Sequence, residues 1–514
     1  MGNNAKITGD SDFAGQYKPH ESYSLISEKV YLEDLFSKQP GGYRLPLPLI
    51  DRVRLQMMKI FREQRDKNEV EKYIPLAGQE SLSPYWRVIL GYLYRAGVIE
   101  TPILYYGEVP HDEPKIYTIR LVSKIPGDPF QLRIMGRGVS FNFNEAISKL
   151  VGELLERYYL IFHKGCDVIK ATVAELKERK VYFLDPFDAD NFSLEQKKNT
   201  PHMSFTEHSR FRWVEGFSLM KKCKAFIPAQ MVYWYYRVGD DEPRLQSSIT
   251  NGAAGMFTRE GAILSGLYEL IQRDTFLLYW LCRVTPEKLV LPAHLKNPKL
   301  QKIVSDTKRY NLEMHILELH NDFGVPVIIV VLIDRSGRGA AVTMGGGCGP
   351  DREECIMRAY CEALSIRYWL RLAPVDTFSE LPNTFDPFTA VPGQNERVLH
   401  WGNKQMLQHI EFFISGSERL LSEQPVEGQE TQAELSNLIE KFKEKGPTYD
   451  IFFYEAKQKA LSELGYYSVS VSVPALLPLY MNERFAPLGA ERLRDFFTRF
   501  GKGDGYNPIP HPFP

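Results

Sequence analysis

Residues 325–333 read VPVIIVVLI, which is the longest apolar run of this 514-residue chain. The run is rich in β-branched residues and is far shorter than the roughly 20 residues that a membrane-spanning helix needs. A continuous apolar stretch of this length is typical of a strand in a sheet that is covered on both faces. The run therefore predicts an α/β core around it.

Composition narrows the possible partners and the compartment. The formal net charge is −1, so the sequence offers no long-range attraction for nucleic acid or for an anionic membrane. The six cysteines form no CxxC pair, which argues against a zinc cage or a disulfide framework. The N-terminus lacks the apolar core of a signal peptide. We expect free thiols and a cytoplasmic protein with neither a nucleic-acid nor a membrane partner.

Along the chain we predict four parts. They are a polar segment over residues 1–30, a mainly helical domain over 31–114, an alternating strand and helix region over 115–500, and a tail over 501–514. The helix that stops at Gly97 and runs into Val98 and Ile99 fits a winged-helix domain, but also an ordinary helix-to-strand connection. The charged segment 423–445 predicts a solvated helical insertion to which we assign no function.

Two segments share one pattern, a glycine-containing stretch followed by an amphipathic helix. In the first, Gly136-Arg137-Gly138 precedes a helix whose polar face carries Glu153, Glu156 and Arg157. In the second, Asn251-Gly252-Ala253-Ala254-Gly255 precedes a helix with Thr258 as its N-cap and with Glu269, Gln272 and Arg273. Aligning Glu153 with Glu269 also aligns Arg157 with Arg273, which indicates two copies of one device.

A third segment repeats the arrangement nearer the C-terminus. Gly345-Gly346-Gly347-Cys348-Gly349 is followed by Asp351 and Glu354, spaced as a helix-capping pair, and by Arg358, Glu362 and Arg367. Any one acidic helix face is more often only solvated. If the three helices converge, Glu153, Glu156, Glu269 and Glu362 can hold divalent cations, while arginines and backbone amides bind phosphate. We therefore predict a nucleotide and metal site.

These motifs, in this order, resemble the YcaO superfamily, whose members use ATP to activate peptide-backbone amides. The resemblance covers residues 115–514 and extends to Val471-Ser472-Val473-Pro474, which is similar to the family's C-terminal strand. It implies an α/β YcaO-type fold with helices and mixed sheets around an ATP site, preceded by the small N-terminal domain. It also implies ATP and Mg²⁺ as cofactors.

The tail selects a branch of the family. Residues 508–514 read PIPHPFP, and alternating prolines favour a preshaped polyproline-II rod. By itself such a tail also suits a partner's aromatic groove. Its PxPxPxP pattern resembles the azoline-forming members, which implies a terminus close to the reaction centre. Pro514, Pro512 and His511 are then candidates for positioning the substrate amide.

The resemblance implies a cyclodehydratase acting on a ribosomally made precursor peptide. A Cys, Ser or Thr side chain attacks the preceding carbonyl, the oxyanion takes the γ-phosphoryl group of ATP, and phosphate leaves to give a thiazoline or oxazoline. By position the metal ligands are Glu153, Glu156, Glu269 and Glu362, and the nucleotide-binding residues are Arg137, Arg157, Glu269, Gln272, Arg273, Arg358, Glu362 and Arg367.

The chain also departs from the family pattern. Gln272, Phe257 and Gly261 stand where the family has Glu, a polar residue and an acid, and fewer acids weaken a divalent-cation site. Glu260 can compensate. Two alternatives therefore remain open, a sister enzyme that forms thioamides or amidines and a noncatalytic scaffold with a degenerate ATP site.

Partners are implied by the resemblance alone. The family works beside a leader-peptide-binding subunit and often beside an FMN-dependent azoline dehydrogenase, so we expect a hetero-oligomeric complex. Residues 31–110 are a candidate for leader recognition within this chain.

Overall fold

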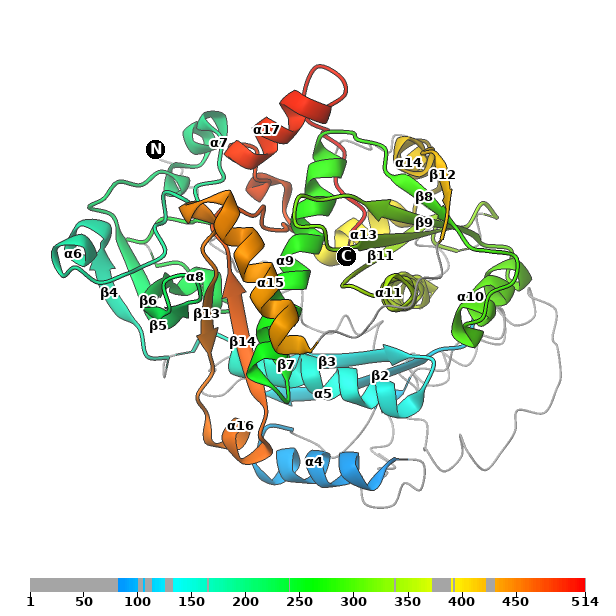
Figure 1. Ribbon diagram of the computed structural model, residues 1–514, viewed down its shortest axis with the longest axis horizontal. Helices are drawn as coiled ribbons and strands as arrows, with labels where there is room; N and C mark the ends of the chain where they lie inside the picture. The colour runs from blue at the N-terminus through cyan, green and yellow to red at the C-terminus, as the bar shows by residue number, and fades with distance from the viewer. Residues whose placement is uncertain are drawn as a thin grey trace, which may run out of the picture. The chain divides into compact units, whose positions relative to one another are not determined.

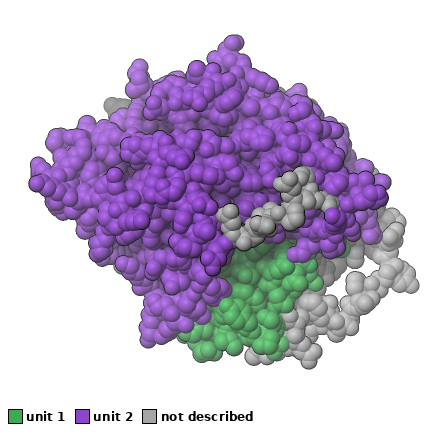
Figure 2. Space-filling view, viewed as in Figure 1, with its two compact units in different colours: residues 1–154, 372–375 green, residues 155–371, 376–514 purple. Residues whose placement is uncertain are grey.

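The computed structural model describes residues 82–99, 105–106, 113–124, 133–163, 166–239, 241–336, 339–371, 390–391, 393–421 and 430–513. Segment 1–30, most of the expected domain 31–114, and Pro514 lie outside these residues, so the winged-helix interpretation stays a prediction. The chain divides into two compact units, residues 1–154 with 372–375 and residues 155–371 with 376–514 (Figure 2).

In the first unit, one antiparallel sheet packs on a helix. The sheet has the order β1 (Tyr105–Tyr106), β2 (Tyr117–Lys124) and β3 (Arg133–Ser140). Helix α4 (Pro84–Arg95) is capped by Ser83, and α5 (Phe143–Tyr159) begins in this unit. A Cβ atom at Gly138 would lie 1.7 Å from the carbonyl oxygen of Ala146, so β3 can approach α5 this closely only with glycine there.

The second unit contains two sheets. One has the order β11-β10-β9-β8-β12, with β8 (Glu287–Val290), β9 (Glu313–Leu319), β10 (Val327–Ile333), β11 (Val342–Cys348) and β12 (Glu418–Leu420). The other has the order β4-β5-β13-β14-β7, with β6 beside β5; its strands are β4 (Ile169–Thr172), β5 (Arg210–Ser218), β6 (Cys223–Pro228), β7 (Ala253–Met256), β13 (Phe452–Glu455) and β14 (Tyr467–Ser472).

Helix α9 (Arg259–Leu281) runs through the middle of this unit and contacts strands of both sheets (Figure 1). Its apolar residues join one large core with β9, β10, β11 and β14. Helix α11 (Arg352–Arg371) packs against β10 and β11. The five-stranded sheet is thus sandwiched between α9 and α11, which gives it two buried faces.

The remaining helices surround these layers. They are α6 (Val173–Glu178), α7 (Leu194–Asn199), α8 (Ala229–Val232), α10 (Pro298–Arg309), α13 (Gln394–Gly402), α14 (Leu407–Ile414), α15 (Thr431–Lys445), α16 (Lys459–Leu464) and α17 (Glu491–Phe500). None of the helices in the described ranges is both long enough and apolar enough to cross a membrane.

Several predictions from the sequence are confirmed. The apolar run becomes β10, in which every residue is buried, although its partners β9 and β11 are both antiparallel. Thr258 caps α9, and Asp351 accepts backbone N–H groups at the start of α11. The charged segment 423–445 is helical over Thr431–Lys445, as α15, and its first residues lie outside the described part of the chain. The structure therefore has the predicted α/β fold with mixed sheets.

Candidate functional site

Each of the three glycine-led segments makes the same hydrogen bond. A backbone N–H of the glycine segment donates to the Oε2 atom of a glutamate on the following helix. The pairs are Arg137 to Glu153 at 2.5 Å, Gly252 to Glu269 at 2.7 Å and Gly346 to Glu362 at 2.7 Å, with sequence separations of 16, 17 and 16. A carboxylate held in this way has one oxygen fixed, which orients the other. The predicted device is therefore present three times.

Glycine lets each strand approach its helix closely enough for this bond. Cβ atoms at Gly345 and Gly347 would lie 2.3 Å from carbonyl oxygens of α11, those of Ala359 and Cys355. Because side chains alternate along a strand, Gly346 faces the side of the sheet that is opposite to α11. Reading the sequence aligned only the first two segments, but the signal for the third was available. The Gly-x-Gly of β3 and that of β11 each place their central residue 16 positions before the glutamate.

On α9, three groups form one polar cluster. Arg273 Nη2 lies 2.7 Å from Oε1 of Glu269, and Arg273 Nη1 donates to Oδ1 of Asn251 at 2.7 Å. Burial raises the pKa of the Glu269 carboxyl, and the charges of Arg273 and Arg157 and the N–H of Gly252 oppose this rise. Asn251 was read from the sequence as part of the motif but not as a site residue. Its role here is to hold Arg273.

Arg157 approaches the same cluster from the end of α5. Its guanidinium lies 5.2 Å from the centre of the Trp234 ring, and its charge acts on Glu269. A cation over an aromatic face is held without losing its charge. Arg157 and Arg273 therefore both act on one carboxylate, that of Glu269.

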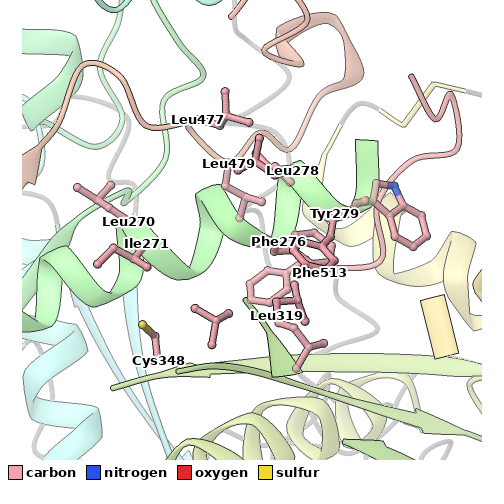
Figure 3. Close-up of a cluster of buried hydrophobic side chains, with 14 of the residues drawn as sticks. Leu270, Ile271, Phe276, Leu278, Tyr279, Leu319, Cys348, Leu477, Leu479 and Phe513 are labelled. Atoms are coloured by element: carbon pink, nitrogen blue, oxygen red, sulfur yellow. The ribbon is translucent and has the colours of Figure 1, made fainter. Parts of the chain in front are cut away.

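The last described residue of the C-terminal tail, Phe513, lies beside this part of α9. A Cβ atom at Gly346 would lie 2.4 Å from Nε2 of Gln272 and 2.9 Å from the ring of Phe513. The Phe513 side chain is buried against Phe276, with ring centroids 5.0 Å apart (Figure 3). Strand β11, helix α9 and the tail thus meet at Gly346, whose N–H binds Glu362.

Other predicted residues lie in different surroundings. Arg358 is half exposed and pairs with Glu354 one turn earlier on α11. Arg367 is buried and forms an ion pair with Asp334, with Nη2 and Oδ2 2.8 Å apart. The His511 ring is fully buried, and its Nε2 lies 2.8 Å from the carbonyl oxygen of Tyr480. Pro512 is buried as well.

Glu153 and Arg137 belong to the first unit, whereas Glu269, Gln272, Arg273 and Glu362 belong to the second. Within the described residues there is no group of three or more His, Cys, Asp or Glu side chains spaced to hold a metal ion. The second unit nevertheless offers the oxygen ligands that Mg²⁺ prefers, the carboxylates of Glu269 and Glu362 and the amide of Gln272. The partly buried carboxyl of Glu269, whose pKa is raised, is also a group that a bound cation stabilises in its charged form.

Residues 135–477 match the family described as YcaO cyclodehydratase, ATP- and Mg²⁺-binding. This chain belongs to the YcaO family. The match covers well over half of the chain and contains all three glycine-led segments. It confirms the resemblance read from the sequence, and with it ATP and Mg²⁺ as the cofactors of the family.

Curated relatives of this YcaO chain carry no assigned activity. It is 25% identical over 223 residues to an uncharacterized protein in the tfuA 3′ region of Rhizobium leguminosarum bv. trifolii, covering 41% of this chain and 50% of that one. A second uncharacterized protein, from Methanothermobacter thermautotrophicus, is 29% identical over 160 residues, 31% of this chain and 42% of that one. The chain spans about half the length of the curated relatives it matches.

Solved structures share the fold. A heterocyclase in complex with substrate and cofactor superposes with a TM-score of 0.63 at 17% identity, covering 83% of this chain and 57% of that one. The YcaO protein of Methanopyrus kandleri, bound with AMPPCP and Mg²⁺, gives 0.53 at 16% identity, covering 82% and 93%. The E. coli microcin synthetase McbBCD complex gives 0.51 at 12% identity, covering 79% and 96%. At these identities the likeness concerns the fold.

Proposed function

We propose that this YcaO chain is an ATP-dependent cyclodehydratase subunit that converts Cys, Ser or Thr residues of a precursor peptide into thiazolines or oxazolines. One observation carries the proposal beyond family membership. Residues 509–513 of the proline-rich tail are buried and reach Gln272 and Gly346, next to the N–H group that binds Glu362. A tail that only served a partner's groove has no need to be buried in its own chain.

The chain's residues have distinct tasks in this proposal. Glu269, Glu362 and the amide of Gln272 would hold Mg²⁺, and Glu153 and Glu156 are the other metal ligands that the family resemblance predicts. Bound MgATP supplies the phosphoryl group that turns the amide oxygen into a leaving group. In this proposal the phosphate oxygens are neutralised by Arg273, Arg157 and Arg358. In the structure Arg273 pairs with Glu269, the charge of Arg157 acts on Glu269, and Arg358 pairs with Glu354. Asn251 keeps Arg273 oriented, and Arg137 and Arg367 complete the predicted nucleotide set.

The proposal includes partners and a compartment. A precursor peptide is the substrate, and the likeness in fold to the McbBCD complex supports a hetero-oligomer. A leader-binding subunit is the partner that we propose. An FMN-dependent azoline dehydrogenase acts on the product. All six cysteines are free thiols, which fits the reducing cytoplasm.

The direct test is mass spectrometry of a precursor peptide incubated with the chain, its partner subunits, ATP and Mg²⁺. Each ring removes the mass of one water and releases one phosphate, so the two yields should match. The Glu153→Gln variant should lose both. A peptide of unchanged mass with the complete complex would contradict the proposal.

Two alternatives are separated by the same assay. A thioamide- or amidine-forming enzyme leaves the ring count at zero but consumes ATP when a sulfur or nitrogen donor is supplied, and it tolerates deletion of the tail. A noncatalytic scaffold with a degenerate ATP site, which the neutral Gln272 suggests, forms no rings. Calorimetry of such a scaffold detects no heat of nucleotide binding.

A further inference from the structure

Three consecutive carbonyl groups of the tail each receive one side-chain hydrogen bond. The indole N–H of Trp280 donates to the carbonyl of Ile509 at 3.0 Å, the indole N–H of Trp401 donates to that of Pro510 at 2.9 Å, and Nη1 of Arg397 donates to that of His511 at 3.0 Å. The side chains of Trp280, Trp401 and Arg397 are essentially fully buried. We call these three residues the carbonyl clamp.

A carbonyl clamp suits a proline-rich strand for a chemical reason. Proline has no backbone N–H, so over this stretch the carbonyl oxygens carry most of the chain's capacity for hydrogen bonds. Donors at three successive carbonyls fix both the register of the tail and its rotation. A slip by one residue would leave three buried donors with wrong or missing acceptors, and each missing bond costs free energy.

Arg397 is itself held firmly. Its Nη2 donates to the carbonyl of Met481 at 3.0 Å and pairs with Glu483, and its guanidinium lies 5.5 Å from the centre of the Tyr480 ring. The two indoles of the clamp also contact each other, with ring centroids 5.6 Å apart. The donors are thus held by contacts that do not involve the tail, and such preorganisation reduces the entropy lost in positioning it.

Helix α9 connects the clamp to the candidate site. Gln272, Phe276 and Trp280 follow each other at intervals of four, so they lie on one face of the helix. Trp280 holds Ile509, Phe276 contacts Phe513, and Gln272 lies beside the last described residue of the tail. The tail therefore runs along this face of α9 toward the polar cluster of Glu269 and Arg273.

We propose that Trp280, Trp401 and Arg397 are positioning residues, which set how far the tail reaches into the site by binding its carbonyl groups at Ile509, Pro510 and His511. This inference rests on the proposed function for its effect on ring formation. The seating of the tail itself is a separate, structural claim. The clamp residues are buried and none of them belongs to the predicted nucleotide or metal set. We therefore expect them to act on the reaction only through the tail.

The experiment uses the full chain with conservative variants. Trp401→Phe and Trp280→Phe each remove one indole donor and keep an aromatic ring, and Arg397→Lys keeps the charge opposite Glu483. The matched control is Trp213→Phe, because the fully buried Trp213 donates to the carbonyl of Ala171 at 2.9 Å in the six-stranded sheet. A fluorinated phenylalanine at position 513 reports the seating of the tail by ¹⁹F NMR.

The clamp variants should shift or broaden the fluorine signal of residue 513, whereas Trp213→Phe should leave it unchanged at a comparable loss of melting temperature. Ring formation at saturating ATP should fall roughly tenfold or more, because a small misplacement of a positioned group is costly. The KM for ATP should stay within about twofold, since nucleotide contacts are intact.

An unmoved fluorine signal in Trp401→Phe and Arg397→Lys would overturn the proposal, even if Trp280→Phe, in the core, failed to fold. A displaced signal with full ring formation would also overturn it. An inactive wild-type chain with a normal fluorine signal would count against the proposed function alone, because the fluorine signal still reports whether the clamp holds the tail.

Discussion

Arg273 and Glu269 form an ion pair one turn apart on α9, with Nη2 and Oε1 2.7 Å from each other. The remaining oxygen of Glu269 accepts the N–H of Gly252 at 2.7 Å. Both oxygens of this carboxylate are therefore engaged, and burial raises its pKa. In the proposed function, a cation bound to one oxygen of Glu269 would free the guanidinium of Arg273 for phosphate, so metal binding and phosphate binding would be coupled at a single residue.

The Glu269→Gln variant tests this coupling. The amide can still accept the N–H of Gly252 but brings no charge, so we expect the affinity for ATP in the presence of Mg²⁺ to fall roughly tenfold or more. Stability should change by only about 1 kcal/mol, because the lost ion pair is offset by the removal of a buried charge. Calorimetric titration and thermal melting measure the two quantities.

The control for this prediction is Glu440→Gln, which removes an exposed carboxylate that pairs with Lys443 on the same helix. It should leave nucleotide affinity and melting temperature unchanged. Equal affinities in the wild-type chain and in Glu269→Gln would show that this carboxylate serves the fold alone.

Gln272 allows a test in the opposite direction. Replacing it with Glu adds an acid within one turn of Glu269, so the variant should melt at a lower temperature in the absence of divalent ions. Added Mg²⁺ should raise its melting temperature more than it raises that of the wild-type chain, because an extra charged ligand tightens cation binding. Gln432→Glu, on the exposed side of α15, should show no such Mg²⁺ dependence. A smaller Mg²⁺ shift in Gln272→Glu would place the cation elsewhere.

Gly346 has no room for a side chain, because residues of the candidate site surround it. Alanine there would put a Cβ atom 2.4 Å from Gln272 and 2.9 Å from Phe513. We expect Gly346→Ala to lower the free energy of unfolding by about 1–3 kcal/mol, since overpacking forces neighbours to move. Denaturant titration should find Gly505→Ala close to wild type, because nothing lies within 4 Å of a Cβ at that glycine. If the two variants were equally stable, the tail would be able to move away from the new methyl group at no cost in free energy.

Local pattern was enough to predict much of this fold. The apolar run predicted β10, and Thr258 and Asp351 predicted where two helices begin. The alignment of Glu153 with Glu269 predicted a repeated pattern of a glycine-containing segment followed by a helix. These features depend on residues within one segment. Periodicity and capping therefore report them directly.

Long-range pairing could not be predicted in the same way. Nothing in the sequence near Arg367 indicates that Asp334 becomes its partner, or that Arg397 binds a carbonyl 114 residues away. Each contact joins two segments that are far apart in the sequence, and their proximity depends on how the sheets and helices pack together. The donors of the carbonyl clamp, two tryptophans and an arginine, also look like ordinary core or surface residues when read singly.

His511 provides a prediction for the dependence of stability on pH. Burial, together with the nearby charge of Arg397, lowers the pKa of its imidazole well below the ordinary value. The folded chain then keeps this ring neutral, while the unfolded chain protonates it below about pH 6.5. The unfolded state therefore binds more protons, and stability falls as the pH drops below that value, by at most about 1.4 kcal/mol per pH unit.

The neighbour Glu483 acts in the other direction, because burial raises the pKa of its carboxyl although Arg397 and Tyr480 oppose the rise. On acidification the folded chain protonates Glu483 at a higher pH than the unfolded chain does. This difference favours folding as the pH falls toward the ordinary pKa of a glutamate. The effect of His511 is therefore isolated by a difference. His511→Gln keeps a donor for the carbonyl of Tyr480 but cannot titrate. Denaturant titrations between pH 5 and 7.5 should show a steeper loss of stability on acidification in the wild-type chain than in His511→Gln, and parallel curves would mean that the buried ring does not control this transition.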